Sequence, residues 1–187
     1  MTMNRELFDK LYAAGILDPV SAAYLWLPDM ECFPPEDAKH YRDEYCTSGV
    51  LTGLTAFAAS SAGDLFCWDS HDRVWLVPPD DGMRVYYAAS LGDAVYRRLL
   101  EFANDAFGNF CSDAEKQALP PDKADCVISQ SEALALLADY DAGFQELLSA
   151  GQHDVLRALV RGGFDRKGRL LTDEACRALI GALLYPV

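Results

Sequence analysis

Apolar residues recur at helical spacing at the start of the chain and at strand spacing after residue 49. Within Arg5–Ala14, four apolar side chains fall on one face, so this pattern predicts a helix that ends at Gly15. Two further helices are expected at Ser21–Leu27 and, after a pair of prolines, at Glu36–Cys46. The first quarter of the chain is therefore predicted to be helical.

Short apolar runs separated by close turns occupy the next part of the chain. They are rich in β-branched and aromatic residues, and the turns between them contain Gly, Ser and Asp, which is typical of strands in a meander. The expected strands are Val50–Ala58, Leu65–Trp68, Arg73–Val77 and Met83–Ala88, with turns at Ser60–Asp64, Asp69–Asp72 and Asp80–Gly82. Strands joined so closely predict an antiparallel sheet.

Helical patterns return at residue 90. Ser90 is expected to cap a helix with one apolar stripe, formed by Leu91, Val95, Leu99, Phe102 and Ala106. A connector with two prolines is expected at Ala118–Ala124. Beyond it, Ser131 is predicted to cap a helix through Ala138, and Thr172 to cap the last helix, which buries Ala175, Leu179, Ile180 and Leu183.

These elements predict an α+β protein, in which an antiparallel sheet packs with helices and a helical extension follows at the C-terminus. We divide the chain into an α+β domain over residues 1–127 and an extension over 128–187 that packs on it, because about 60 residues alone form a marginal core. Within the extension, Gly151–Asp165 resembles half of an ankyrin repeat. An ordinary helix that ends at glycine explains the same pattern.

The net charge of the chain indicates which classes of binding partner to expect. The chain has 29 acidic and 16 basic residues, a net charge of −13, and residues 1–130 hold 21 of the acids but only 10 of the bases. Such a surface repels nucleic acid and anionic lipid and attracts basic proteins. Neither a secretory signal nor a membrane-spanning run is recognisable, so we expect a cytoplasmic protein.

Candidate chemistry is sparse, and we predict no cofactor, no metal site and no catalytic centre. The three histidines, His40, His71 and His153, are scattered along the chain. The cysteines are expected to be buried, reduced thiols; they are Cys32, Cys46, Cys67, Cys111, Cys126 and Cys176. One enzymatic alternative stays open, in which Cys67 is a nucleophile and His71 its base.

The stretch Leu54–Asp69 resembles the centre of the SUKH superfamily, which includes a yeast cell-wall synthesis regulator and many bacterial immunity proteins. The features in common are a Gly-Asp turn, an aromatic strand, a valine-containing strand and a helix, found here at Gly63-Asp64, Phe66–Trp68, Val74–Val77 and Ser90–Phe107. The resemblance covers about residues 30–107. Where many members have Asn-Gly-Gly, this chain has Cys46-Thr47-Ser48-Gly49.

The resemblance implies recognition of another protein, and for many bacterial members the neutralisation of a toxin, often a nuclease. On this basis the chain is predicted to be an immunity protein, or antitoxin, that binds a basic toxin domain. The alternative is a regulator or scaffold of the same fold with a housekeeping role.

Contact residues are expected on the turns of the sheet, where acidic side chains can mimic phosphate and an aromatic side chain can anchor the partner. The predicted contacts are Asp64, Asp69, Asp72, Trp75, Asp80 and Asp81. Gly63 and Asp64 are expected to form a structural turn, because glycine reaches positive φ without strain and aspartate bonds nearby amides.

Overall fold

The computed structural model describes residues 3–17, 29–34, 36–40, 49–78, 83–104, 110–125, 127–165 and 169–184. The chain divides into two compact units, which are described separately. The sheet unit comprises residues 1–98 and 182–187, and the helical unit comprises residues 99–181. Both boundaries fall inside helices, namely α3 (Leu91–Asn104) and α8 (Asp173–Leu184).

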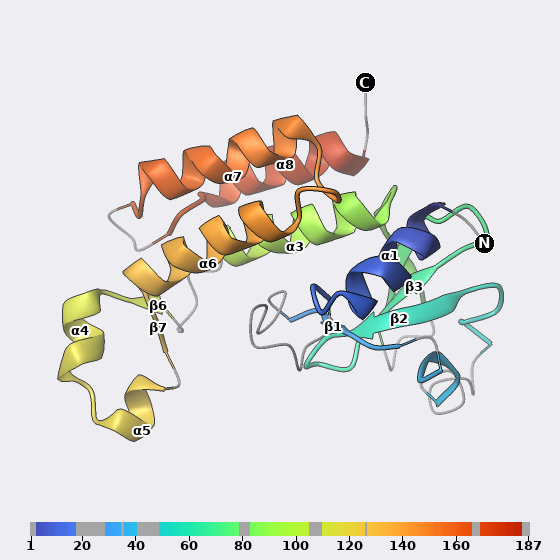
Figure 1. The fold of residues 1–187 in the computed structure, drawn as a ribbon, viewed down its shortest axis with the longest axis horizontal. Helices are drawn as coiled ribbons and strands as arrows, with labels where there is room; N and C mark the ends of the chain where they lie inside the picture. Colours follow the sequence, from blue (N-terminus) through green and yellow to red (C-terminus); the bar gives the residue numbers. More distant parts are fainter. Residues whose placement is uncertain are drawn as a thin grey trace. The chain divides into compact units, whose positions relative to one another are not determined.

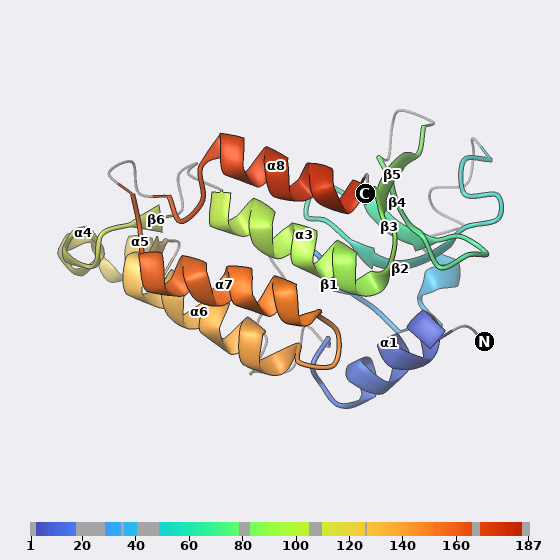
Figure 2. The same ribbon diagram turned by 90° about the horizontal axis from the view of Figure 1, so that it is seen from above.

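The sheet unit contains α1 (Met3–Ala13) and a five-stranded antiparallel sheet whose strands follow chain order. The strands are β1 (Glu31–Cys32), β2 (Thr55–Ala59), β3 (Leu65–Trp68), β4 (Val74–Val77) and β5 (Val85–Ala88). Figure 2 shows β2 to β5 as successive neighbours. The α+β class and the antiparallel meander predicted from the sequence are thus confirmed.

The first face of the sheet is aromatic and is covered by α1 (Figure 1). The rings of Phe57 and Trp68 stack with centroids 4.2 Å apart, and Phe8 of α1 meets them edge-on at 5.6 and 5.1 Å. Burying a phenylalanine side chain stabilises a fold by about 1.5–3 kcal/mol, so this cluster is a main attachment of α1 to the sheet. Apolar spacing in Arg5–Ala14 predicted the helix, and the aromatic partners explain where it packs.

The second face of the sheet is aliphatic. Side chains alternate along a strand, so Leu65 and Cys67 point away from Phe66 and Trp68. They join Ala56 and Val77 in a buried cluster, which is covered by Phe33, Ala38, Leu51 and Leu54. This covering segment includes part of the stretch Val50–Ala58 that was predicted to be a strand. In the structure β2 begins only at Thr55, because Gly49 and Gly53 take φ values of 69° and 76° in turns.

Other predictions for this unit have mixed outcomes. Strand β3 has the predicted bounds, and Ser90 caps α3 through a bond from the Asp93 amide to its hydroxyl, 3.1 Å long. The predicted helix Ser21–Leu27 lies outside the described residues. Of the predicted helix Glu36–Cys46, only residues 36–40 are described: residues 36 and 37 form a turn and residues 38–40 are helical.

The helical unit begins most of its helices with a serine cap. The chain forms β6 (Phe110–Cys111), α4 (Asp113–Ala118), α5 (Pro121–Ala124), β7 (Ile128–Ser129), α6 (Gln130–Gly143) and α7 (Ala150–Gly162). Three capping boxes start α4, α6 and α7, formed by Ser112 with Glu115, Ser129 with Glu132 and Ser149 with Gln152. The predicted cap at Ser131 is therefore wrong: Ser129 has the glutamate three residues later that a reciprocal cap requires.

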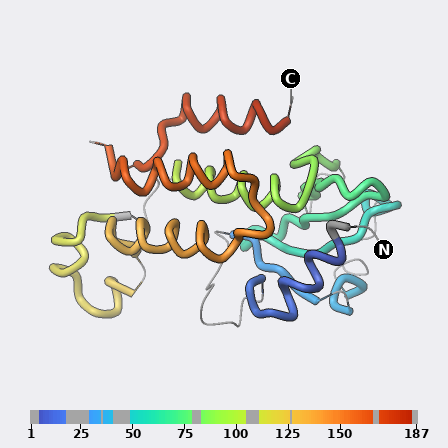
Figure 3. Tube along the Cα trace, turned by 45° about the horizontal axis from the view of Figure 1, so that its top comes forward, coloured from blue at the N-terminus to red at the C-terminus, as the bar shows by residue number. Residues whose placement is uncertain are grey.

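Helices α6 and α7 form an antiparallel hairpin, along which the chain runs out and back (Figure 3). Buried between or beside them are Leu137, Tyr140, Phe144, Leu148 and Leu156. The ankyrin-like stretch forms α7, which ends where Gly163 takes a φ of 65°. Thr172 caps α8 as predicted, since its hydroxyl accepts a bond from the Ala175 amide. No helix among the described residues is long and apolar enough to span a membrane.

Candidate functional site

The turn between β3 and β4 is organised by one buried carboxylate. Asp69 accepts hydrogen bonds from the amides of His71 and Arg73 at 2.8 and 3.1 Å. Its second oxygen accepts from Arg73 Nε at 2.7 Å and from Trp75 Nε1 at 3.0 Å. Burial raises the pKa of Asp69, but the bonds from Trp75, His71 and Arg73 outweigh it and lower the pKa to about 2.

The same turn is tied to α1 through Arg5. Its Nη2 donates to the Asp69 carbonyl at 3.4 Å, its Nε lies 3.9 Å from an Asp72 carboxylate oxygen, and its guanidinium lies 5.7 Å from the Trp68 ring centroid. Asp72 takes a φ of 62°, which a non-glycine residue adopts with some strain. The turn is thereby held by contacts from a helix more than sixty residues away in the chain.

Trp75 of β4 is the centre of a half-exposed group of side chains, which come from β4, from β5 and from the residue directly before each of these strands. Tyr86, its cross-strand partner, meets the indole edge-on with centroids 5.6 Å apart. The guanidinium groups of Arg73 and Arg84 lie 5.7 and 5.4 Å from the indole centroid, within the range of cation–π attraction. We call these four residues, Arg73, Trp75, Arg84 and Tyr86, the Trp75 surface.

The predicted contact residues differ in their burial and in their hydrogen-bond partners. Asp69 and Asp72 are buried and engaged with arginines of their own chain, so their carboxylates support the turn. Asp64 exchanges two bonds with Ser60 in the preceding turn, where Gly63 takes a φ of 88°. Asp80 and Asp81 lie outside the described residues. Trp75 is half-buried, so part of its side chain is accessible to a partner. The two arginines and the tyrosine around it were not identified from the sequence.

The geometry of Cys67 does not fit the cysteine-nucleophile alternative. Its side chain is fully buried in the aliphatic cluster, and this burial raises the pKa of the thiol to about 12. His71 is exposed on the turn, where its Nδ1 lies 3.2 Å from the Ser70 hydroxyl. A nucleophilic cysteine needs a low pKa and access to substrate. Cys67 in this position has neither.

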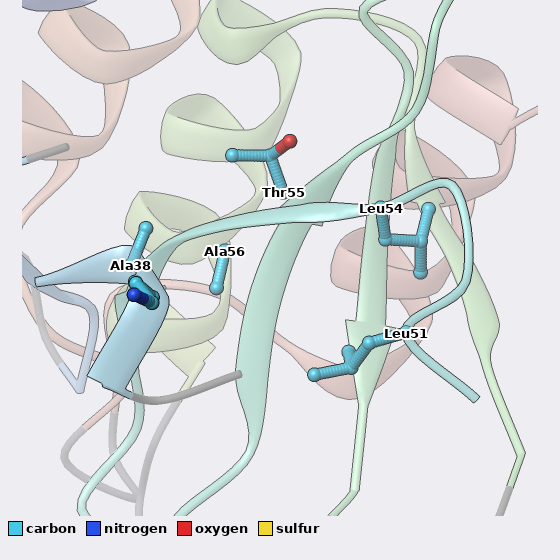
Figure 4. A pocket seen from close by; sticks show the side chains of 6 residues that line it. Ala38, Leu51, Leu54, Thr55 and Ala56 are labelled. Carbon is cyan, nitrogen blue, oxygen red and sulfur yellow. The ribbon is translucent and has the colours of Figure 1, made fainter. Parts of the chain in front are cut away.

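A small cavity lies on the aliphatic side of the sheet unit (Figure 4). Its volume is about 120 Å³, and it is lined by Ala38, Lys39, Leu51, Leu54, Thr55 and Ala56. Pockets for small organic ligands are larger, roughly 300–1,000 Å³. Within the described ranges, no three histidine, cysteine, aspartate or glutamate side chains gather as a metal site would require.

The helical unit holds a second charged cluster that sequence reasoning missed. Asp141 of α6 accepts from Arg157 Nε at 2.9 Å and lies 2.6 Å from Nδ1 of the buried His153, both on α7. The cluster links the two helices of the hairpin. His153 follows a capping box and the aspartate lies twelve residues earlier, so only the pairing of α6 with α7 brings them together.

In comparisons with known proteins, no protein-family model, no curated protein and no solved structure matches the chain.

Proposed function

We propose that this chain is a protein-binding domain and that the Trp75 surface is its principal contact. The observation that carries the proposal is the composition of that surface. Alanine scanning of many interfaces finds tryptophan, tyrosine and arginine to be the residue types that contribute most to binding, and here two arginines and a tyrosine surround one half-exposed tryptophan.

The Trp75 side chain is also held in place before any partner arrives. Its indole nitrogen donates to Asp69, and its ring is bounded by Arg73, Arg84 and Tyr86. A side chain that is already ordered loses little conformational entropy on binding, which favours affinity. Asp69 therefore contributes to recognition by positioning Trp75. Its own carboxylate oxygens already accept hydrogen bonds from neighbouring residues of the chain.

The partner we propose is a basic protein, and the role an immunity protein that neutralises a toxin. A net charge of −13 steers basic partners toward the chain. The specific role rests on the resemblance of residues 30–107 to the SUKH superfamily, in which an apolar strand, a Gly-Asp turn, an aromatic strand, a valine-containing strand and a helix follow one another. Exposed acids among the described residues would adjust the rate of association, and Asp80 and Asp81, which precede β5 in the sequence, remain predicted contacts.

Affinity capture from the native host tests the proposal. The full chain, immobilised at low salt, should retain a basic protein that elutes at high salt. In purified form that protein should bind with nanomolar affinity, and its toxic activity should fall to zero at a 1:1 ratio. If the captured protein has no toxic activity, the immunity role is wrong and a regulatory role replaces it.

Variants of the Trp75 surface test the contact itself. Trp75→Ala should weaken binding of the captured protein by about 30-fold, and Arg84→Ala by about tenfold, as expected for central contacts. Glu31→Ala, an exposed site on the opposite edge strand, is the matched control and should bind normally. Circular dichroism of each variant separates lost affinity from lost fold. Unchanged affinity in both Trp75→Ala and Arg84→Ala would place the interface elsewhere.

A further inference from the structure

The Trp75 surface carries positive charge in a chain that is acidic overall. Its exposed members are Arg73 and Arg84, and their guanidinium groups lie 5.7 and 5.4 Å from the centroid of the same indole. The chain as a whole has a net charge of −13. Because physiological salt screens exposed charges beyond about 8 Å, a group bound at this surface interacts more strongly with the two arginines than with distant acids.

Both arginines still have hydrogen-bond donors available. Arg73 donates from Nε to Asp69 at 2.7 Å, and its side chain remains 47% exposed. Arg84 is exposed, contacts the indole and has no carboxylate partner among the described residues. A guanidinium has five N–H donors in a planar fork, which matches the two oxygens of a carboxylate. The remaining donors can therefore bind an acceptor that comes from another molecule.

The aspartates close to this surface already accept hydrogen bonds within the chain. Asp69 and Asp93 both act electrostatically on Tyr86. Asp69 is buried and accepts its bonds from the turn and from Trp75. Asp93 accepts a bond from the Ser90 hydroxyl at 2.9 Å, at the start of α3. Neither aspartate is bonded to Arg84, so a carboxylate of another molecule would not have to displace one of them.

One buried oxygen fixes the relative positions of an arginine and the tryptophan. Asp69 Oδ2 accepts hydrogen bonds from Arg73 Nε at 2.7 Å and from Trp75 Nε1 at 3.0 Å. A guanidinium and the indole are thus ordered before any partner binds. Groups that are already ordered lose less conformational entropy on binding, which favours a specific ligand over a loose electrostatic contact.

We propose that the Trp75 surface recognises a carboxylate of the partner protein, carried by an aspartate or glutamate beside an aromatic side chain. The carboxylate binds the available donors of Arg84 and Arg73, and the aromatic side chain packs on Trp75 and Tyr86. The inference rests on the proposed protein-binding function and adds the chemistry of the partner's contact. The partner is then basic overall, which brings it to the chain, and acidic at the point that meets Arg84.

Other occupants fit this distribution of charge less well. A nucleic acid also presents anionic groups to arginine, but its duplex carries one negative charge per about 1.7 Å and is repelled by a chain of net charge −13. A second copy of this chain has the same net charge and is repelled as well. A basic protein with an acidic group at the contact is attracted both by the total charge and by the two arginines.

Side-chain NMR signals of the full chain test the inference with a defined probe. The probe is the blocked peptide Ala-Glu-Phe-Glu-Ala, and the control peptide has lysine in place of both glutamates. We expect saturable shifts of the Trp75 indole N–H and Arg84 Nε–H signals, with a dissociation constant on the order of 1 mM, since so short a peptide buries little surface. The lysine peptide should bind at least about tenfold more weakly.

A pair of matched variants identifies the side chain responsible. Arg84→Gln should lose most of the preference, so that the two peptides bind within about threefold of each other. Arg161→Gln removes the same charge from an exposed site in the helical unit and should keep the full preference for the glutamate peptide. The backbone amide spectrum of each variant shows whether it is folded.

The inference is overturned if neither Trp75 nor Arg84 shows a saturable shift, if the lysine peptide binds as tightly, or if Arg84→Gln keeps the full preference. Inorganic phosphate that binds the same signals as tightly as the glutamate peptide would make the surface a general anion site and would also overturn it. So would shifts that depend on protein concentration without peptide, since they would assign the surface to a second copy. None of these results overturns the proposed function, because capture of a basic protein and its loss in Trp75→Ala are measured independently.

Discussion

The sheet unit and the helical unit have almost the same net charge, but their acidic side chains make different kinds of contact. The sheet unit has 15 acidic and 8 basic residues, net −7, and the helical unit has 14 and 8, net −6. In the sheet unit, Asp69 gathers donors from its turn and from β4, and Arg5 reaches the same turn from α1. In the helical unit, Glu115 and Glu132 each close a capping box within their own first turn, and Asp141 joins α6 to Arg157 of α7.

This difference changes how the acidity of the chain is understood. Counted over residues 1–130, the excess of acids looks concentrated in the first two thirds of the chain; counted by structural unit, it is shared. Net charge is therefore a property of the whole chain, and it favours encounter with a basic partner in general. Recognition depends on individual side chains, and the tertiary contacts decide which of them remain available.

The largest effect is expected from removing the extension. A fragment of residues 1–127 lacks α8, whose Cys176 thiol donates to the Leu100 carbonyl, and lacks Leu171, whose amide donates to the Ala103 carbonyl. The second half of α3 then loses its cover, so we expect the fragment to be insoluble or largely unfolded by circular dichroism. The full chain should unfold in one transition that salt hardly moves, since burial dominates surface pairs. A fragment as stable and soluble as the whole chain would contradict this.

Replacing the Asp69 carboxylate should give the next largest effect. Asp69→Ala leaves two amides, a guanidinium and an indole nitrogen without their common acceptor. We expect the free energy of unfolding in urea to fall by about 3 kcal/mol. Asp37→Ala, which removes an exposed carboxylate of the same unit, should change it by less than about 0.5 kcal/mol. Equal effects of the two substitutions would show that Asp69 does not organise the turn.

Acid should weaken the protein through the same residue. The pKa of Asp69 is lowered from 3.8 to about 2 in the folded state, so its contribution to stability is fully present above pH 3.8 and is lost as the pH falls from there through about 2. Urea midpoints measured from pH 5 to pH 2 should therefore fall more steeply for the parent protein than for Asp69→Ala. Parallel pH profiles would contradict the predicted linkage.

A smaller, local effect is expected in the helical unit. Ser129→Ala removes the hydroxyl that accepts the Glu132 amide at the start of α6, and it should cost about 1 kcal/mol of unfolding free energy. Ser149→Ala should cost a similar amount at α7. Ser70→Ala, in an exposed turn of the sheet unit, is the control and should be nearly neutral. If Ser129→Ala were neutral as well, local capping would not be what starts α6.

Strand order, the antiparallel meander and the Ser90 and Thr172 caps could be predicted because each depends on a few consecutive residues. The caps at Ser112, Ser129 and Ser149 also carry a local signal, a glutamate or glutamine three residues later, and applying that rule throughout would have found them. The two-residue strands β6 and β7 carry no such signal, since each exists only by pairing with the other.

The sequence by itself determined the alternation of strands and turns, the apolar faces of the helices and the net charge of −13. It also marked Trp75 as a candidate contact. Only the tertiary structure decided that Asp69 points inward, that Arg73 and Arg84 flank Trp75, and that β5 is an edge. The reason is physical: periodicity records which side chains share a face, whereas the fate of a carboxylate depends on donors that distant segments bring to it.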